Sequence, residues 1–267
     1  MIWHVVSDVH GNADALARAG EGADALLVLG DLLDFVDYHD PAGGILGDLV
    51  GREGSVEFAR LRSGGAPGEM RRFVREMWAA VENPRERVLD AVRAQYERLF
   101  GVLSDLAGSL PVYLTPGNVD VPAVWPAEIP GVRVLDGAVA DIGGLRVGFV
   151  GGVPLPAGVE PRDGVFPAYL RRREDYDAAV AAVTRDGLDV LASHAPPDDA
   201  ELAYDVDARH REASSTALLD AIVAHRPRAA LFGHVHAPLA TRRRLGSTEC
   251  VNAGHFQRRG TPIVLRW

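Results

Sequence analysis

The sequence contains no lysine: all 28 basic residues among its 267 are arginine. A Walker A nucleotide-binding loop and Schiff-base catalysis both need a lysine side chain, so both are excluded. Cys250 is the only cysteine, which excludes an intrachain disulfide and a zinc cluster built from thiolates. The chemistry of this chain must therefore come from other side chains.

Long apolar runs are also missing. Charged residues, Gly or Pro interrupt every stretch before it reaches the roughly 20 residues of a membrane-spanning helix. Strand-like residues begin at Ile2 and lead straight to Asp8, which leaves no room for a standard export signal, so we expect a cytoplasmic protein. The net charge of −9 argues against binding to duplex nucleic acid.

Metal-binding residue types follow five apolar runs along the chain. The runs have the composition of buried strands, and the polar residue falls where each predicted strand meets its loop. Loops at one edge of a sheet can converge, so two carboxylates, one carboxamide and four imidazoles are expected to gather into a two-metal site. The blocks are Asp8-Val9-His10, Gly30-Asp31, Gly117-Asn118-Val119-Asp120, Ser193-His194 and Gly233-His234-Val235-His236.

The order of these blocks resembles the signature of the calcineurin-like metallophosphoesterases, which is Asp-x-His, Gly-Asp, Gly-Asn-His-Asp/Glu, a single His and Gly-His-x-His. The resemblance extends from about Ile2 to Asn252 and departs at Val119, where the family usually has His. It implies that Asp31 bridges two metals. The other implied ligands are Asp8, His10 and His236 for the first metal, and Asn118, His194 and His234 for the second.

The α/β fold that the resemblance implies is a four-layer α/β/β/α sandwich of two mixed sheets. We expect a single domain over residues 1–267, with a helical insertion at about 36–106 after the second strand. Helical spacing from Glu69 to about Leu106 predicts two helices separated by Pro84. The insertion is either a lid or substrate wall, or a surface elaboration or dimer patch, so a homo-oligomer stays open.

The expected chemistry is hydrolysis of a phosphoester. Two divalent ions bring four positive charges, and Asp8, Asp31 and a bridging hydroxide return three, which leaves a formal +1 that attracts a phosphoryl group. Two metals can also present the hydroxide to phosphorus and stabilise the developing negative charge. Asn118 adds no charge. Imidazole and carboxylate ligands favour manganese, with iron or zinc as alternatives.

Three further histidines are candidates for the site: His210, which precedes a predicted helix start, His39 and His255. His210 is assigned a catalytic role beside Asp31 and Asn118, because another residue must act where Val119 replaces the family's His. Asp34 or Asp120 could orient metal-bound histidines, although each also fits a loop cap.

The missing His favours a small-molecule phosphodiester or phosphoanhydride as substrate, since Val119 cannot donate a proton to a poor leaving group. Related small bacterial and archaeal phosphodiesterases also lack this His. A phosphomonoesterase or protein phosphatase is the alternative. A partner-binding scaffold on the same fold is less favoured, because all seven ligand positions are intact.

Overall fold

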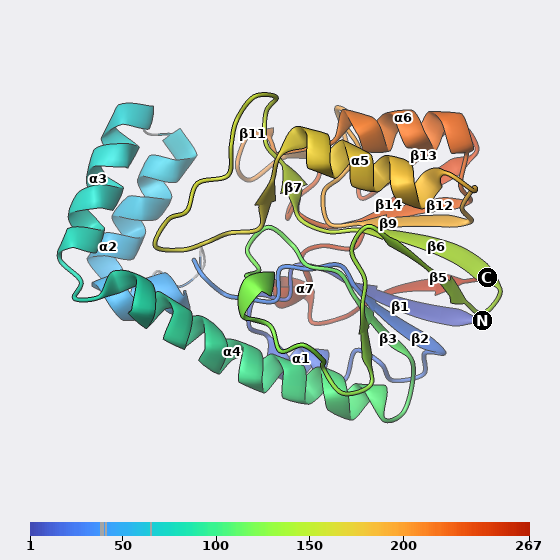
Figure 1. Cartoon of the computed structure of the whole chain (residues 1–267), viewed down its shortest axis with the longest axis horizontal. Coiled ribbons are helices and arrows are strands. Elements are labelled where there is room, and N and C mark those ends of the chain that lie inside the picture. Colours follow the sequence, from blue (N-terminus) through green and yellow to red (C-terminus); the bar gives the residue numbers. More distant parts are fainter. Residues whose placement is uncertain (38–39, 41, 65) are drawn as a thin grey trace.

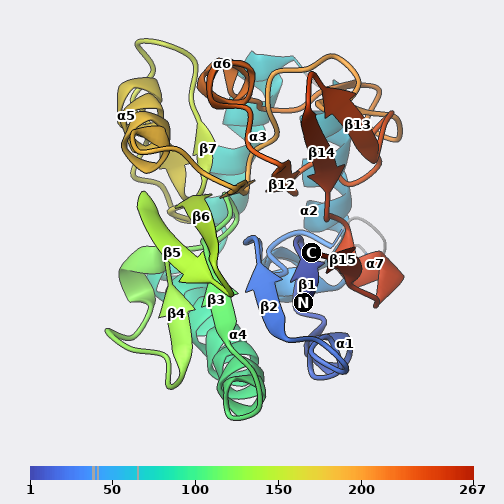
Figure 2. The ribbon, with the colours of Figure 1, turned by 90° about the vertical axis from the view of Figure 1, so that its right-hand side faces the viewer.

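Two β-sheets stack face to face at the centre of the molecule, and helices cover the outer side of each. The computed structural model describes residues 1–37, 40, 42–64 and 66–267. Helices α1 (Ala13–Leu16) and α4 (Pro84–Ala107) lie against the first sheet, and α5 (Arg173–Thr184) and α6 (Thr216–His225) lie against the second (Figures 1 and 2). The predicted four-layer α/β/β/α sandwich is confirmed.

The first sheet has five strands in the order β15-β1-β2-β3-β4. Strands β1 to β4 run parallel, and β15 pairs antiparallel with β1. Parallel strands end at the same edge of a sheet, so the loops after β1, β2 and β3 lie side by side. The strands are β1 Ile2–Val6, β2 Ala25–Val28, β3 Val112–Leu114, β4 Val132–Val134 and β15 Ile263–Arg266.

The second sheet has six strands in the order β13-β14-β12-β9-β6-β5. Its four central strands are parallel, and the two edge strands pair antiparallel. Its parallel strands therefore also deliver their loops to one edge. The strands are β5 Ala138–Ile142, β6 Leu145–Val150, β9 Val190–Ser193, β12 Ala229–Phe232, β13 Arg242–Leu245 and β14 Thr248–Asn252.

Alternation along the strands produces three apolar layers. In β1, Val5 faces the second sheet while its neighbour Val6 faces the helices, because successive side chains of a strand point to opposite faces. Trp3 and Phe149 fill the layer between the sheets, and Tyr176 of α5 is fully buried in the third layer. Both faces of each sheet are thus covered, which explains why the central strands β2 and β12 are continuous apolar runs.

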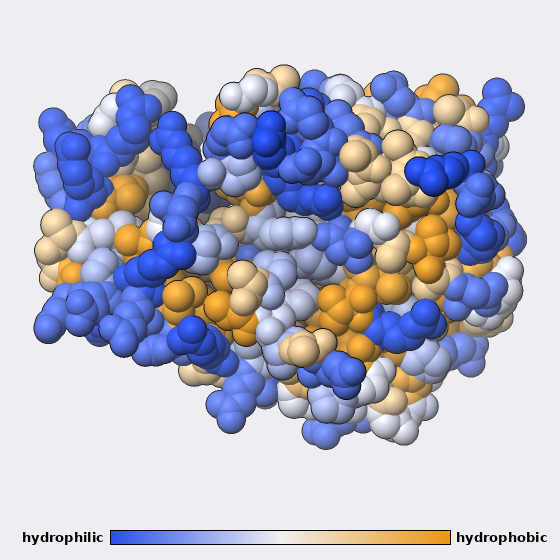
Figure 3. Space-filling model, viewed as in Figure 1, coloured by the Kyte–Doolittle hydropathy of each residue, from blue (hydrophilic) through white to orange (hydrophobic). Residues whose placement is uncertain are grey.

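The region between the second and third strands of the first sheet is helical. Apolar residues of α4 recur at helical spacing and pack against that sheet, whereas α2 (Gly44–Gly64) and α3 (Pro67–Ala79) project beyond it (Figure 1). Pro84 begins α4, as the sequence predicts. The surface seen over α3 is mostly hydrophilic (Figure 3). The single domain over residues 1–267 with an insertion at about 36–106 stays a prediction.

Short elements near the sheet edges are absent from the sequence-based expectations. They are β7 Val153–Pro154, β8 Leu170–Arg171, β10 Tyr204–Asp205, β11 His210–Arg211, α7 Phe256–Arg259 and the 3₁₀ turn Pro122–Val124. The loop between β7 and β8 extends toward α2 and α3 (Figure 1). Phe166 of this loop stacks on Phe35, which lies between β2 and α2, with ring centroids 3.8 Å apart. Among the described residues, no helix combines the length and apolarity needed to cross a membrane.

Candidate metal centre

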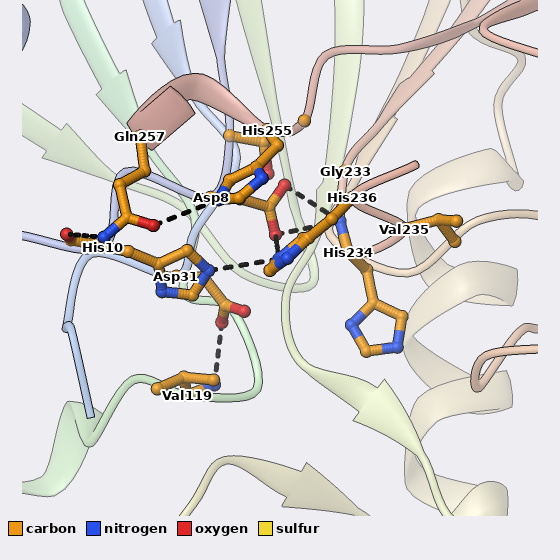
Figure 4. Close-up of polar contacts among 12 residues, drawn as sticks. Asp8, His10, Asp31, Val119, Gly233, His234, Val235, His236, His255 and Gln257 are labelled. Carbon is orange, nitrogen blue, oxygen red and sulfur yellow. Dashed lines mark hydrogen bonds and ion pairs between the residues drawn. The ribbon is translucent and has the colours of Figure 1, made fainter. Parts of the chain in front are cut away.

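The five sequence blocks converge where the edges of the two sheets meet. Loops after β1, β2 and β3 bring their ligand types from the first sheet, and loops after β9 and β12 bring theirs from the second. Figure 4 shows His10, Asp31, Asp8 and His236 turned toward one another. The predicted convergence at one edge is therefore present, with both sheets contributing to it.

Several of these loops hold the backbone in the left-handed region. The φ angles of Asp8, His10, Asp31 and His234 are 58°, 41°, 53° and 69°. Such a conformation costs a non-glycine residue about 1–3 kcal/mol and persists only where the surroundings enforce it. At these positions the turns direct the side chains toward the shared centre.

Two of the glycines in the site permit close approaches to its carboxylates. A Cβ on Gly117 would collide with the carboxylate and backbone of Asp31, and a Cβ on Gly233 would collide with Ser7 and the carboxylate of Asp8. The glycine that precedes Asn118 and the one that precedes His234 are thus required by packing. Gly117 lets two loops of the first sheet touch, and Gly233 lets a loop of the second sheet touch the loop after β1.

The first group of ligands lies around His10 and His236. Their Nε2 atoms are 3.2 Å apart, and His236 Nε2 is 3.4 Å from Asp8 Oδ1. Ligand atoms of Asp8, His10 and Asp31 all lie within 4.8 Å of one another. This spacing would allow one cation to contact these side chains together.

The second group lies around His194. Its Nε2 is 2.9 Å from Asn118 Oδ1 and 3.4 Å from Asp31 Oδ1. Ligand atoms of Asp31, His194 and His234 also fall within 4.8 Å of one another. Asp31 belongs to both groups, as a carboxylate shared by two cations would.

Backbone carbonyls fix two of the imidazoles. His10 Nδ1 is 2.8 Å from the carbonyl oxygen of Leu33, and His194 Nδ1 is 2.7 Å from that of Leu29. A proton on each Nδ1 would be donated there, which leaves Nε2 facing the site as an electron-pair donor. These carbonyls therefore orient the two imidazoles, which is the role suggested for Asp34 or Asp120.

Asp120 instead holds the loop that carries Asn118. It accepts hydrogen bonds from the backbone N–H groups of Gly117 and Leu32 and from the hydroxyl of Tyr96. Burial, with the nearby charge of Asp31, raises the pKa of Asp120 to about 7. The alternative reading of Asp120 as a loop cap fits these contacts.

Charge is concentrated in the buried centre. Burial opposes ionisation of Asp8 and Asp31, but His236 and His194 respectively outweigh it and lower the pKa of each carboxyl. Burial lowers the pKa of His194 and Asp31 raises it, with a result of about 9. A proton on His194 thus balances Asp31, and an entering cation would displace that proton.

The donor set fits divalent cations. Two buried carboxylates, a carboxamide oxygen and four imidazoles face a shared space, and imidazole with carboxylate suits manganese, iron or zinc. His234 adds a further sign, since its buried Nε2 has no hydrogen-bond partner within the described part of the chain. Burial lowers the pKa of His234 to about 3, which keeps it neutral and able to bind a metal.

The other sequence candidates are placed differently. Half-buried Val119 donates its backbone N–H to Asp31 Oδ1 at 2.7 Å. His210 lies on β11 with 48% of its side chain exposed, and its Nε2 is 3.6 Å from Glu212. Its link to the centre therefore runs through Glu212. His39 falls outside the described residues.

His255 lies beside the first group. Its ring stacks on His236 with centroids 4.0 Å apart, and the two, with His10, form a further set of potential ligands. Gln257 links the loop to the site, since its Oε1 is 3.1 Å from His255 Nε2 and its Nε2 donates to the carbonyl oxygen of His10 (Figure 4).

Sequence reasoning missed Gln257, Glu212 and a group behind Asn118. In that group the backbone N–H of Tyr169 donates to the carbonyl oxygen of Asn118, and its hydroxyl donates to Asp136 at 2.6 Å. Asp136 also pairs with Arg171 at 3.1 Å. Glu212 and Gln257 do not follow a buried apolar strand as the ligand blocks do. Asp136 follows β4, but that strand is short and two of its three residues are exposed, so the pattern that located the ligand blocks did not single these residues out.

Comparison with known proteins agrees with this site. The family model for calcineurin-like phosphoesterases matches residues 3–238. The crystal structure of TT1561 from Thermus thermophilus has a TM-score of 0.59 at 17% identity and covers 99% of this chain and 98% of that chain. Another solved structure has the same TM-score and identity, with coverages of 96% and 91%. These likenesses concern the fold.

No curated protein matches the sequence. The family match, however, spans every ligand block from Asp8 to His236, and the structure gathers those blocks into one buried centre. The chain therefore belongs to the calcineurin-like phosphoesterases, a family of metal-dependent phosphoester hydrolases.

Proposed function

We propose that this protein is a binuclear metal-dependent hydrolase of small-molecule phosphodiesters or phosphoanhydrides. The first metal would be held by Asp8, His10 and His236, the second by Asn118, His194 and His234, with Asp31 shared. When bound, two divalent cations, manganese first among those to test, would activate a water molecule and stabilise negative charge on the phosphoryl group. A homo-oligomer through the region 36–106 stays open.

The observation that carries this proposal is Val119. Its backbone N–H is committed to Asp31 Oδ1, and its side chain has no hydrogen to donate. A general acid commonly contributes about 10²–10⁴ in rate. A site with Val at this position favours substrates whose leaving group departs without a proton, such as aryl or strained cyclic diesters and anhydrides.

The chain's own residues supply orientation and charge balance. Asn118 offers oxygen without charge, so the centre keeps only the two carboxylates of Asp8 and Asp31 in contact with the cations. The Val119 N–H keeps Asp31 oriented, and Asp120 keeps the Asn118 loop in place through Gly117. The net positive charge that results would attract an anionic phosphoryl group.

Space for the remainder of a substrate lies beside His10. A cavity of about 320 Å³ opens there, within the usual size range of a ligand site. Its walls come from the loops after β1 and β2, from α4 and from α7. The lining residues are His10, Gly11, Asn12, Asp34, Gln95, Arg98, Leu99 and Gln257. A diester carries a second organic substituent on its phosphate, and that substituent needs such a space.

Paired aryl substrates test the proposal. Metal-depleted protein is reloaded with Mn²⁺ and assayed with bis(p-nitrophenyl) phosphate and with p-nitrophenyl phosphate, which share a leaving group. We expect the diester to be hydrolysed with the larger kcat/KM. Faster hydrolysis of the monoester would favour the phosphomonoesterase or protein phosphatase alternative. Metal binding without hydrolysis of either would favour a scaffold.

A further inference from the structure

We propose that Glu212 positions His234 as a ligand of the second metal, by accepting the hydrogen of its Nε2. Glu212 lies outside the five ligand blocks, on the segment just after β11. This inference rests on the proposed two-metal centre and adds to it a residue that touches neither metal nor substrate.

The first step is the state of His234. Its Nε2 is shielded from solvent and lacks a hydrogen-bond partner in the described part of the chain. A buried polar atom without a hydrogen-bond partner destabilises the folded protein. A buried ring nitrogen without a partner in a functional site is explained if its hydrogen bond forms when a ligand binds.

Glu212 is the charged group beside that atom. The distance from His234 Nε2 to Glu212 Oε2 is 4.0 Å, which is longer than a hydrogen bond. Since Nε2 is turned toward Glu212, Nδ1 is the nitrogen left for the metal. A neutral imidazole whose Nδ1 binds a cation must carry its proton on Nε2. Metal binding therefore creates a buried N–H that points at a carboxylate.

The fold holds Glu212 at this place. The hairpin of β10 and β11 is tied to the loop after His236, because Asp205 Oδ2 accepts from the N–H of Ala237 at 3.0 Å and the N–H of Val206 donates to the carbonyl of Ala237. The backbone N–H of Glu212 donates to Ala203 at 2.8 Å. His210 Nε2 lies 3.6 Å from the other carboxylate oxygen of Glu212. Hydrogen bonds thus hold the hairpin against the loop that carries His234 and His236.

The role fits the pattern of the other imidazoles. His10 and His194 each direct one ring nitrogen to a carbonyl oxygen and the other to the centre. At His234 a carboxylate would replace the carbonyl, and a charged acceptor forms the stronger hydrogen bond. The position of His210 is thereby explained as well, because it contacts Glu212 rather than the reacting atoms.

Metal titration tests the inference without substrate. Mn²⁺ affinities of both sites are measured by competition with a chelator in wild type, Glu212→Ala and Glu212→Gln. We expect Glu212→Ala to weaken the second ion by about 10–100-fold and to leave the first unchanged. Glu212→Gln should retain most of the affinity, since its amide oxygen still accepts. Glu201→Ala is the control, a half-exposed acid that pairs with Arg243 instead.

A spectroscopic readout tests the same hydrogen bond independently of metal affinity. In the wild type loaded with Co²⁺, the Nε2 proton of His234 should give a paramagnetically shifted NMR signal that is protected from exchange with water. Glu212→Ala should lose that protection, whereas His210→Ala should keep it.

The inference is overturned if Glu212→Ala binds both ions as tightly as wild type, or if the loaded wild type shows no such protected proton. A wild type that binds fewer than two ions would overturn the two-metal proposal together with it. If the protein binds two ions and shows the protected proton but hydrolyses no phosphoester, only the proposed function is contradicted.

Discussion

At the scale of single residues, Asp31 is where the two ligand groups meet. Its carboxylate lies 3.4 Å from His194 Nε2 and accepts from Val119, and it belongs to both sets of ligand atoms. We expect Asp31→Asn to lose both metals together, because an amide removes the shared charge that offsets two cations. Metal analysis after gel filtration measures this loss.

Asp14→Asn is the matched control for Asp31→Asn, since Asp14 is an exposed acid that pairs with Arg98. It should keep both ions. Retention of two tightly bound metals and full turnover by Asp31→Asn would show that Asp31 is not shared between them.

Val119 determines the expected balance between diesters and monoesters. Val119→His restores a group that can donate a proton to a poor leaving group. We expect this variant to raise hydrolysis of an alkyl monoester relative to that of an aryl diester, measured as the ratio of the two kcat/KM values. Val119→Ala is the control for lost packing. A ratio that the His variant does not change would contradict this role for Val119.

Asp34 carries a dependence of stability on pH. Its Oδ1 is shielded from solvent and has no hydrogen-bond partner among the described residues. Burial, reinforced by the charges of Asp37 and Asp48, raises the pKa of Asp34 to about 7 from 3.8. The folded state thus favours the protonated acid, and the stability it gains is complete below about pH 4 and lost as the pH rises through 7.

Asp34→Asn removes this penalty, since an amide does not ionise. In metal-depleted protein we expect the variant to have a higher Tm than wild type at pH 8 and the same Tm at pH 4, measured by circular dichroism. Asp105→Asn, an exposed acid on α4, is the control. A variant whose Tm differs from wild type equally at both values would show that Asp34 does not titrate in this range.

At the scale of elements, α2 and α3 project from the body while α4 packs within it. Replacement of residues 51–80 by a short Gly-Ser link should leave two bound metals and activity on a small aryl diester, because every ligand block lies outside this segment. Its kcat/KM for bulkier diesters should change. Loss of metal from a folded deletion variant would instead make these helices part of the core.

Strands and helices were predictable where the spacing of apolar residues along the sequence, rather than tertiary contacts, determines the structure. Val112–Leu114 and Ala229–Phe232 are buried strands that precede the third and fifth ligand blocks, as the pattern of those blocks predicts. Helix α4 lies within the helical spacing predicted from Glu69 to about Leu106. Helix α5 begins only at Arg173, because Leu170 and Arg171 just before it pair with β7. A pairing between two-residue strands leaves no periodic signal, so tertiary contacts decide such elements.

The convergence of the candidate ligands was predictable for the same reason that the strands were. Each follows a buried run, so its position is local information. Glu212 and Gln257 act across elements that only the folded chain brings together, and Glu212 lies 22 residues from His234 in a hairpin of two short strands. Side chains that support a site in this way depend on three-dimensional packing.

At the scale of the whole molecule, the centre joins the two sheets. Asp8, His10, Asp31 and Asn118 come from loops of one sheet, and the remaining histidines come from the other. Two cations would therefore connect both halves of the sandwich at the edge where the strands end. Ligands that bind only the folded state also stabilise it, so metal removal should lower the Tm.

Titration of activity with metal tests the central claim most directly. Metal-depleted protein is assayed with bis(p-nitrophenyl) phosphate as Mn²⁺ is added in measured equivalents, at protein concentrations well above the dissociation constants. We predict no turnover without metal and a rise that ends at two equivalents per chain. Full turnover in the metal-depleted protein, or saturation at one equivalent, would contradict a binuclear centre.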